Sequence, residues 1–250
     1  MSEFKGKVAF ITGAGGGMGL AISRQFLNHG GQAILIDVKD EPAELAEFSG
    51  NYVYVQGDLT DEATVEKAMG LSESTYGRLD YLVNVAGVLW FDRDKSVLDI
   101  DMDVWDQVFN INLRSMALTI RHAVPVMRKS NGGAMVHFST IQCLRGDSSP
   151  QDAYSASKAG VGALSKSAAM QFAADGIRSN VIYPGVAMTP MQARWEGNDE
   201  IQEAVGNAIP LGRMGVADDM ANACLFLLSD KASYITGTDL IVDGGISAKL

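Results

Sequence analysis

Seven short apolar runs recur along the chain, and longer segments with helical periodicity separate them. The runs are KVAFIT, QAILID, YVYVQG, LDYLVN, AMVHFS, RSNVIYP and TDLIVD. They are almost continuously apolar, whereas a strand with one face in water alternates polar and apolar residues. The pattern therefore predicts an α/β fold with a single doubly wound parallel sheet of about seven strands and helices on both faces.

The segments between the runs carry boundary signals. Asp61 and Glu62 open DEATVEKAMGLSESTYG, where carboxylates favour the positive end of a helix, and Gly77 closes it. Pro184 ends NVIY, because proline cannot donate to a sheet ladder. The segment TPMQARWEGNDEIQEAVGNAIPLG fits neither a strand nor a regular helix, which is typical of a lid or a binding loop. No repeat or linker interrupts the alternation, so we expect one domain over residues 1–250.

Composition and charge narrow the class of protein. Of the 250 residues 47% are hydrophobic, which is enough for a buried core, and the formal net charge is -10 without a basic patch. This charge disfavours nucleic acids and anionic lipid as partners. Cys143 and Cys224 lack metal-type or redox spacing, and no segment reads as a secretion leader or a membrane span. We expect a cytoplasmic protein with no nucleic-acid or membrane partner.

A glycine-rich turn follows the first apolar run. Residues 12–19 read TGAGGGMG and lead into a helical pattern. Glycines permit a tight turn and let backbone N–H groups approach a phosphate, and the helix N-terminus adds free donors. The turn favours a dinucleotide-binding site. The alternative is a flexible glycine-rich turn that binds no ligand, which would have the same sequence pattern.

The second apolar run ends in Asp37, roughly twenty residues after the glycines, where an acidic side chain can accept hydrogen bonds from both ribose hydroxyls of an adenine nucleotide. A carboxylate at this place repels a 2′-phosphate. The turn and Asp37 together predict NAD rather than NADP as the cofactor. The alternative for Asp37 is a solvated carboxylate at a strand end.

Tyr154 and Lys158 lie four residues apart in SPQDAYSASKAGVG, so on a helix they share a face. A phenol titrates at about 10, and a neighbouring ammonium favours the phenolate and lowers that pKa. The pair predicts an acid/base group for an alcohol and its ketone. On its own the spacing is weak, because many exposed helices carry it.

The motifs and their order give the whole chain a resemblance to the short-chain dehydrogenase/reductase family. The matching pieces are TGAGGGMG, GDLTD, VNVAG, NINL, YSASK and NVIYPGVAMTP. The resemblance implies a Rossmann-like NAD-binding domain and a homotetramer, with a dimer as the alternative. It places cofactor contacts at Gly13, Gly17, Met18, Gly19, Asp37, Asp58, Leu59, Asn84, Ala86, Gly87, Tyr154, Lys158, Pro184, Gly185, Val186 and Thr189.

The same resemblance assigns individual roles to these positions. Asp58 and Leu59 fall on the pair that contacts the adenine, and Asn84 falls near the adenosine ribose. Val186 and Thr189 fall where the family engages the nicotinamide carboxamide.

The resemblance also implies the catalytic residues Tyr154, Lys158, Asn112 and a hydroxyl after the fifth strand. Asn112 of NINL falls on the asparagine that holds a water and extends a proton relay from Lys158 to solvent. The hydroxyl is either Ser139 or Thr140, because neighbours on a strand point to opposite faces. We favour Thr140, which keeps the register of the strand; its extra methyl group narrows the pocket.

A second departure from the family is Val85, which replaces the second asparagine of its N-N-A-G motif. This replacement should remove a strand-end hydrogen bond rather than the chemistry. The three histidines have no ligand-like spacing, so we expect no metal site. These histidines are His29, His122 and His137. We expect His137 to be a hydrogen-bonded polar group inside the sheet.

The neighbouring loops hold candidates for substrate contact. Met188, Met191 and Trp195 suit either a pocket wall or the packing of a lid. Arg145 and Gln151 could meet a polar substrate, although loop arginines are usually solvated.

These observations predict an NAD-dependent oxidoreductase that interconverts a secondary alcohol and a ketone, or a lactol and a lactone. The substrate candidates are a cyclic alcohol, a sugar, a hydroxysteroid and an aryl carbinol. Two alternatives remain. One is a regulatory protein that binds the dinucleotide to sense redox state without turnover, and the other is an epimerase or dehydratase of the related longer family.

Overall fold

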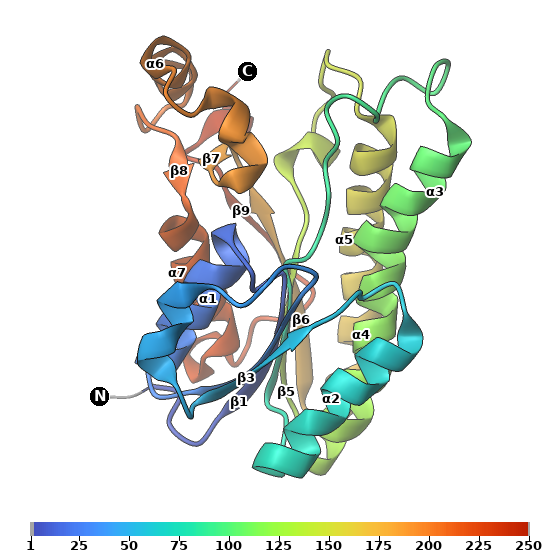
Figure 1. Cartoon of the computed structure of the whole chain (residues 1–250), viewed down its shortest axis with the longest axis vertical. Coiled ribbons are helices and arrows are strands. Elements are labelled where there is room, and N and C mark those ends of the chain that lie inside the picture. Colours follow the sequence, from blue (N-terminus) through green and yellow to red (C-terminus); the bar gives the residue numbers. More distant parts are fainter. Residues whose placement is uncertain (1–2, 250) are drawn as a thin grey trace.

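The computed structural model describes residues 3–249. Its main sheet has seven parallel strands in the order β3-β2-β1-β4-β5-β6-β9, which confirms the predicted α/β fold (Figure 1). The strands are β1 Val8–Thr12, β2 Gln32–Asp37, β3 Tyr52–Gln56, β4 Tyr81–Asn84, β5 Gly133–Phe138, β6 Ile177–Pro184 and β9 Asp239–Val242.

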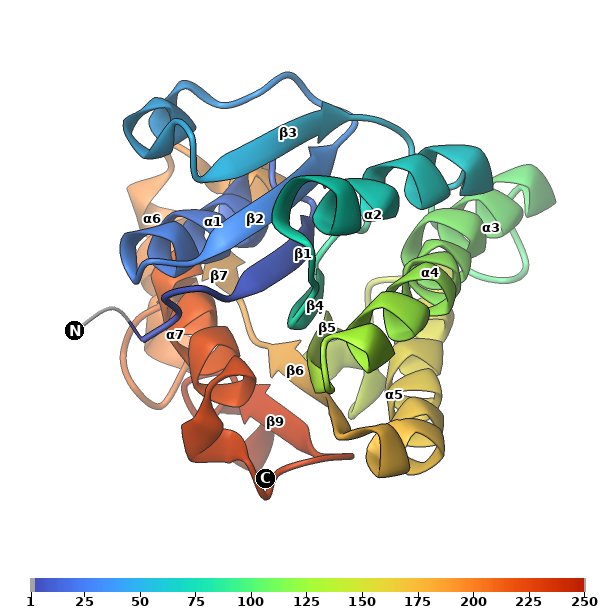
Figure 2. The ribbon, with the colours of Figure 1, turned by 90° about the horizontal axis from the view of Figure 1, so that it is seen from below.

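Helices cover both faces of this sheet, and the view from below in Figure 2 separates the two layers. One layer holds α1 (Gly17–Asn28) and α7 (Ala217–Leu228). The other holds α2 (Glu62–Tyr76), α4 (Ser115–Lys129) and α5 (Asp152–Phe172). Between α3 (Met102–Phe109) and α4 the chain continues as a π-helical turn, Asn110–Arg114.

Neighbouring residues of one strand pack into different cores. In β1, Ile11 packs with Phe26 of α1, whereas the preceding Phe10 packs with Met69 of α2, and all four side chains are buried. Alternate residues of a strand point to opposite faces. The continuous apolar runs therefore follow from a sheet that is buried on both sides.

The boundary signals around α2 are confirmed. The side chain of Asp61 accepts hydrogen bonds from the amides of Ala63 and Thr64, and Gly77 ends the helix with a φ of 72°. Left-handed backbone of this kind favours glycine.

The long segment after β6 is more regular than the sequence suggested. It contains α6 (Asp199–Ala208) and a short pair of strands, β7 (Ala187–Met188) and β8 (Gly215–Val216). The expectation that no regular helix forms there was wrong. The side chain of Asn198 accepts from the amide of Ile201 and caps α6, a signal that the local sequence did carry.

The strand order reverses between β1 and β4, so the connections that follow these two strands leave in opposite directions and open a crevice at their carboxyl ends. No helix among residues 3–249 is both long enough and apolar enough to cross a membrane.

Candidate active site

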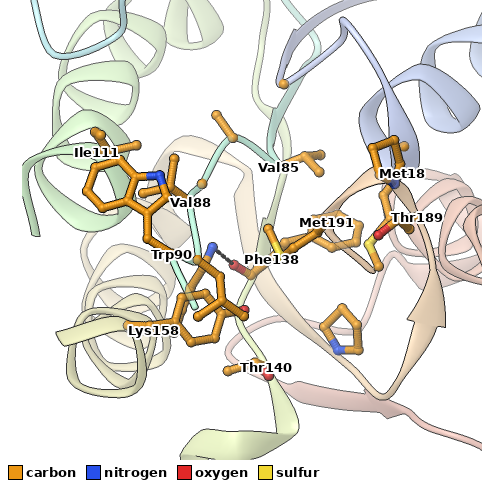
Figure 3. Close-up of a pocket in the computed structure, with 18 of the residues that line it drawn as sticks. Met18, Val85, Val88, Trp90, Ile111, Phe138, Thr140, Lys158, Thr189 and Met191 are labelled. Atoms are coloured by element: carbon orange, nitrogen blue, oxygen red, sulfur yellow. Dashed lines mark hydrogen bonds between the residues drawn. The ribbon is translucent and has the colours of Figure 1, made fainter. Parts of the chain in front are cut away.

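A cavity of about 1000 Å³ opens at the carboxyl ends of β1, β4, β5 and β6. It brings together most of the residues that the sequence singled out. Its lining includes Gly13, Gly17, Met18, Gly19, Asp37, Asp58, Leu59, Ala86, Gly87, Ser139, Thr140, Tyr154, Lys158, Pro184, Gly185, Val186 and Thr189. Figure 3 shows Met18 and Thr189 on one side of this cavity and Trp90 and Lys158 on the other.

The glycine-rich turn is packed tightly against the connection after β4. Gly13 has a φ of 71°, and a Cβ atom there would lie 2.9 Å from the amide nitrogen of Ala86. The hydroxyl of Thr12 accepts hydrogen bonds from the amides of Val85 and Ala86, at 3.0 and 3.1 Å. Thr12 therefore holds the connection at Val85, where the family's second asparagine is missing.

The carboxylate of Asp37 is held by the main chain at the end of β2. One oxygen accepts from the amide of Gly15 at 2.9 Å and the other from the amide of Lys39 at 3.0 Å. Asp58, after β3, accepts from the amide of Thr60 at 2.8 Å. Both acidic side chains line the cavity in fixed orientations.

Tyr154 and Lys158 lie in the first two turns of α5, and both side chains are buried. Burial raises the pKa of Tyr154 to about 12, and the nearby hydroxyl of Thr140 opposes this only in part. Burial lowers the pKa of Lys158 to about 8. The expected lowering of the Tyr154 pKa by the Lys158 ammonium is not seen here: burial raises that pKa, and the Lys158 Nζ donates to the Phe138 carbonyl at 2.9 Å (Figure 3).

The two candidate hydroxyls after β5 have different partners. Ser139 donates to the carbonyl of Lys158 at 2.8 Å and thereby ties β5 to α5. Thr140 lines the same cavity as Tyr154 and opposes the rise that burial causes in the pKa of that phenol, and its hydroxyl accepts from the amide of Gln142 at 3.3 Å. Ser139 is thus occupied by the fold, and the arrangement favours Thr140 as the hydroxyl that can reach a substrate.

Asn112 lies in the π-helical turn, behind the lysine. Its amide group accepts from the Val88 amide at 2.7 Å and donates to the Val88 carbonyl at 3.0 Å and to the Ser157 hydroxyl at 3.1 Å. A Cβ atom on Gly87 would lie 2.9 Å from the Lys158 Nζ and 3.1 Å from the Asn112 Oδ1. Gly87 therefore leaves the space in which these two side chains approach each other.

The side chain of Asn84 does not face the dinucleotide side, contrary to the expectation from the resemblance. Its Oδ1 accepts from the Thr119 hydroxyl at 2.8 Å, and its Nδ2 lies 3.1 Å from the Nδ1 of His137. The other nitrogen of His137 meets the Ser179 hydroxyl at 3.2 Å. Burial lowers the pKa of His137 to about 3. Asn84 belongs to a buried polar chain across the sheet, and His137 is the satisfied polar group that the sequence predicted.

Asp94 is a site residue that the sequence argument missed. It lines the cavity, is 1% exposed, and accepts from the backbone amides of Ala153 at 3.1 Å and Tyr154 at 2.7 Å. It therefore caps the start of α5 from another connection, about sixty residues away in sequence. No local signal marks it, because the partner amides are distant in the chain.

The substrate side of the cavity consists of side chains from three connections. Met191, Trp195, Arg145 and Gln151 line the cavity, whereas Met188 belongs to β7 and lies outside the lining. Further lining residues that the sequence argument did not name are Trp90, Phe91, Asp94, Lys95, Gln142, Asp147 and Arg194.

Comparison with known proteins places this chain in a family. Residues 13–247 match the family model described as enoyl-(acyl carrier protein) reductase. The chain belongs to the short-chain dehydrogenase/reductase family. The resemblance seen in the sequence is confirmed, and the chain is an oxidoreductase of this family.

Three relatives of the short-chain dehydrogenase/reductase family align along nearly their whole length. The chain is 35% identical over 249 residues to cis-4-hydroxycyclohexanecarboxylate dehydrogenase of Sinomonas cyclohexanicum, which covers 98% of both chains. It is 34% identical over 248 residues to borneol dehydrogenase of Lavandula x intermedia, which covers 99% of this chain and 93% of that one. The solved structure of Thermoplasma acidophilum aldohexose dehydrogenase has a TM-score of 0.90 at 29% identity and covers 100% of this chain and 97% of that chain.

Membership of the short-chain dehydrogenase/reductase family implies NAD(P) as cofactor, and the glycine turn fits such a group. A Cβ atom on Gly19 would overlap the carbonyl of Gly13, so the cradle admits only backbone. The first turn of α1 has no side-chain cap, which leaves its N–H donors available to a phosphate.

Proposed function

We propose that this protein is an NAD-dependent dehydrogenase that interconverts a cyclic secondary alcohol and its ketone. The observation that carries the proposal is that Thr140 and Tyr154 line the same cavity as the glycine turn, with Thr140 near enough to oppose the rise that burial causes in the pKa of Tyr154. Two hydroxyls that converge on one point can hold and deprotonate a substrate hydroxyl.

Each residue has a defined part in this proposal. Thr140 donates to or accepts from the substrate oxygen and fixes its place, and Tyr154 takes the proton as phenolate. The Lys158 ammonium favours that phenolate by its charge, and Asn112 holds the main chain beside it for a relay toward solvent. The nicotinamide supplies the hydride acceptor when NAD is bound.

We further propose Gly13, Gly17, Met18 and Gly19 as the pyrophosphate cradle, with Asp58 and Leu59 at the adenine. Ala86 and Gly87, with the main chain at Asn84, would border the nucleotide, and the connection after β6 would hold the nicotinamide carboxamide. That connection contributes Pro184, Gly185, Val186 and Thr189, which line the cavity.

The preference for NAD is proposed from Asp37, whose charge at the end of β2 would repel a 2′-phosphate. Lys39 also lines the cavity and is the cation that a 2′-phosphate would use. The test is kcat/KM for NAD and NADP in the wild type, Asp37→Asn and Lys39→Gln. We expect the wild type to prefer NAD and Asp37→Asn to lose most of that preference. A wild-type preference for NADP that Lys39→Gln abolishes would overturn the proposal.

Two arguments support a cyclic alcohol as substrate. Trp90, Phe91 and Trp195 give the substrate side aromatic walls, which suit the flat or saturated faces of a ring. Two relatives are named for the oxidation of ring alcohols, cis-4-hydroxycyclohexanecarboxylate and borneol. The aldohexose dehydrogenase structure keeps sugars as the second candidate.

The experiment is NAD reduction across a panel of cyclic alcohols, sugar lactols, hydroxysteroids and aryl carbinols, with Tyr154→Phe as the inactive control. We expect turnover of ring alcohols. If NAD binds but no compound is turned over, the proposal fails in favour of a redox-sensing regulator.

For the assembly we propose a homotetramer of single-domain, cytoplasmic subunits. Exposed apolar side chains along the sheet edge support this, with Tyr234 and Ile241 beside or within β9 and Met170 on α5. Light scattering should give four times the subunit mass; a monomer would contradict the proposal, and a dimer is the alternative. One cooperative unfolding transition is expected for the domain.

A further inference from the structure

The substrate side of the cavity concentrates positive charge on a chain whose formal net charge is -10. Lys95, Arg145 and Arg194 line it, and the acidic residues on the same side are Asp94 and Asp147. Asp94 is buried and occupied by two backbone amides. Three cations thus stand against two carboxylates on this side, and the charge that a substrate meets there is net positive.

Arg194 is oriented by aromatic rings of the same wall. Its Cζ lies 3.6 Å from the ring centroid of Phe91 and 4.7 Å from that of Trp195, and all three residues line the cavity. Stacking on an aromatic face holds a guanidinium flat and leaves its in-plane N–H donors free for a ligand.

The guanidinium of Arg194 has no carboxylate partner among residues 3–249. The ion pairs of the described residues engage other arginines, namely Arg24, Arg78, Arg121, Arg128 and Arg213. Asp147 is near enough to influence the pKa of Arg194, yet its oxygens accept from the Ser149 amide and the Gln142 side chain. Partial burial lowers the pKa of Arg194, but the residue remains exposed on the cavity wall, so its unpaired guanidinium is accessible to a ligand.

Arg93 provides an internal comparison. Its Cζ lies 4.3 Å from the ring centroid of Trp90, but its guanidinium donates to the side chain of Gln107 at 3.1 Å, and it lies outside the cavity lining. Both arginines stack on an aromatic ring, and only Arg194 presents open donors to the substrate.

We infer that Arg194, supported by the charge of Arg145, binds a carboxylate on the substrate. The substrate class is then a ring alcohol that carries a carboxylate away from the carbon that is oxidised. The inference rests on the proposed function, because it names the substrate of that same site. A planar carboxylate matches the fork of a guanidinium, and Asp147 disfavours a more highly charged phosphate.

Binding is the first test, and it does not depend on turnover. Calorimetry on the NAD-loaded protein compares cyclohexanecarboxylate with cyclohexanecarboxamide, which has the same shape and no charge. We expect the carboxylate to bind about ten-fold or more tightly than the amide in the wild type. Arg194→Gln should remove that difference, Arg194→Lys should restore part of it, and Arg93→Gln should leave it unchanged.

Kinetics is the second test, with a hydroxycyclohexanecarboxylate and its carboxamide as substrates. Arg194→Gln should raise KM for the carboxylate about ten-fold and leave both kcat and the carboxamide unaffected. Equal binding and equal turnover of the two compounds by the wild type would overturn the inference and leave the dehydrogenase proposal intact. Turnover of neither ring alcohol, with normal NAD binding, would instead overturn the proposed function.

Discussion

The cavity has a glycine-turn side and a substrate side, and the two sides differ in whether backbone or side chains form them. On the glycine-turn side the polar contacts are made by backbone, such as the amides of Gly15 and Lys39 on Asp37 and those of Val85 and Ala86 on Thr12. On the substrate side the wall consists of side chains from long connections. The first side is fixed by the fold itself, whereas the second can change its side chains without disturbing a strand. Tyr154 and Lys158 lie between the two.

Tyr154→Phe has the largest expected effect. It should abolish proton transfer and leave both sides of the cavity intact. Loss of the acid/base group should lower kcat about 10²–10⁴-fold, because positioned proton transfer contributes that much. NAD affinity, measured by calorimetry, should stay the same. Tyr76→Phe, at the end of α2, is the matched control and should behave as the wild type; full activity in Tyr154→Phe would exclude the mechanism.

Lys158→Met should show how much folding stability the protein loses by burying a lysine between the two sides of the cavity. Burial lowers the pKa of Lys158 from 10.5 to about 8, which corresponds to about 3 kcal/mol of lost stability while the lysine is charged in both states. Between these two values the unfolded chain binds more protons than the folded one, so wild-type stability rises with pH.

The variant lacks this cost and should therefore be more stable than the wild type at pH 7, with an advantage that shrinks as the pH rises from about 8 to 10.5. The raised pKa of Tyr154 changes the pH dependence of stability only above pH 10.0, and it does so equally in the wild type and the variant. Thermal unfolding across this range measures the gap. A gap in Tm that does not depend on pH would contradict the prediction.

Asp94→Ala tests whether the substrate side positions the catalytic helix. It removes two hydrogen bonds to the start of α5 and should lower the free energy of unfolding by about 1–3 kcal/mol. Displacement of Tyr154 should also lower kcat about ten-fold or more.

The control for this variant is Asp101→Ala, since Asp101 caps α3 and accepts from the Asp103 amide at 2.9 Å. It should lose stability as a capping residue does, by about 1 kcal/mol, and keep kcat. Equal losses of kcat in both variants would show that Asp94 acts only on stability.

Gly13→Ala should damage the glycine-turn side alone, with the smallest expected effect. Gly77→Ala is its matched control, because the two glycines have φ values of 71° and 72°. Both variants should lose about 1–2 kcal/mol from left-handed strain. Only Gly13 has a neighbour at the new Cβ, the Ala86 amide nitrogen at 2.9 Å, whereas Gly77 has nothing within 4 Å. NAD affinity should therefore fall in Gly13→Ala alone, and an equal fall in both would refute the role of close packing.

Features that depend on residues close together in sequence were readable in advance. The apolar runs predicted the seven strands because burial on both faces removes the polar alternation. The glycine turn and the Tyr154 and Lys158 pair follow fixed local spacings, and the cavity unites them. The cap at Asn198 was also readable, although the long segment around it was taken for irregular chain.

Features that depend on distant partners were not readable. The resemblance placed Asn84 beside the ribose, but its side chain meets Thr119 and His137 from neighbouring elements. The importance of Asp94 and of the stack between Arg194 and Phe91 arises only when separate connections meet.

The amino-acid sequence by itself determined the layered sheet, the glycine turn and the tyrosine–lysine pair, because helical and strand periods and turn geometry are local properties of the chain. Only the tertiary structure shows that Ser139 and Thr140 have different partners, since the Ser139 hydroxyl donates to the carbonyl of Lys158 in α5. It also shows that Arg194 lines the cavity and that Arg93 does not. Such choices depend on the register of the sheet and on the docking of its connections, which no short stretch of sequence encodes.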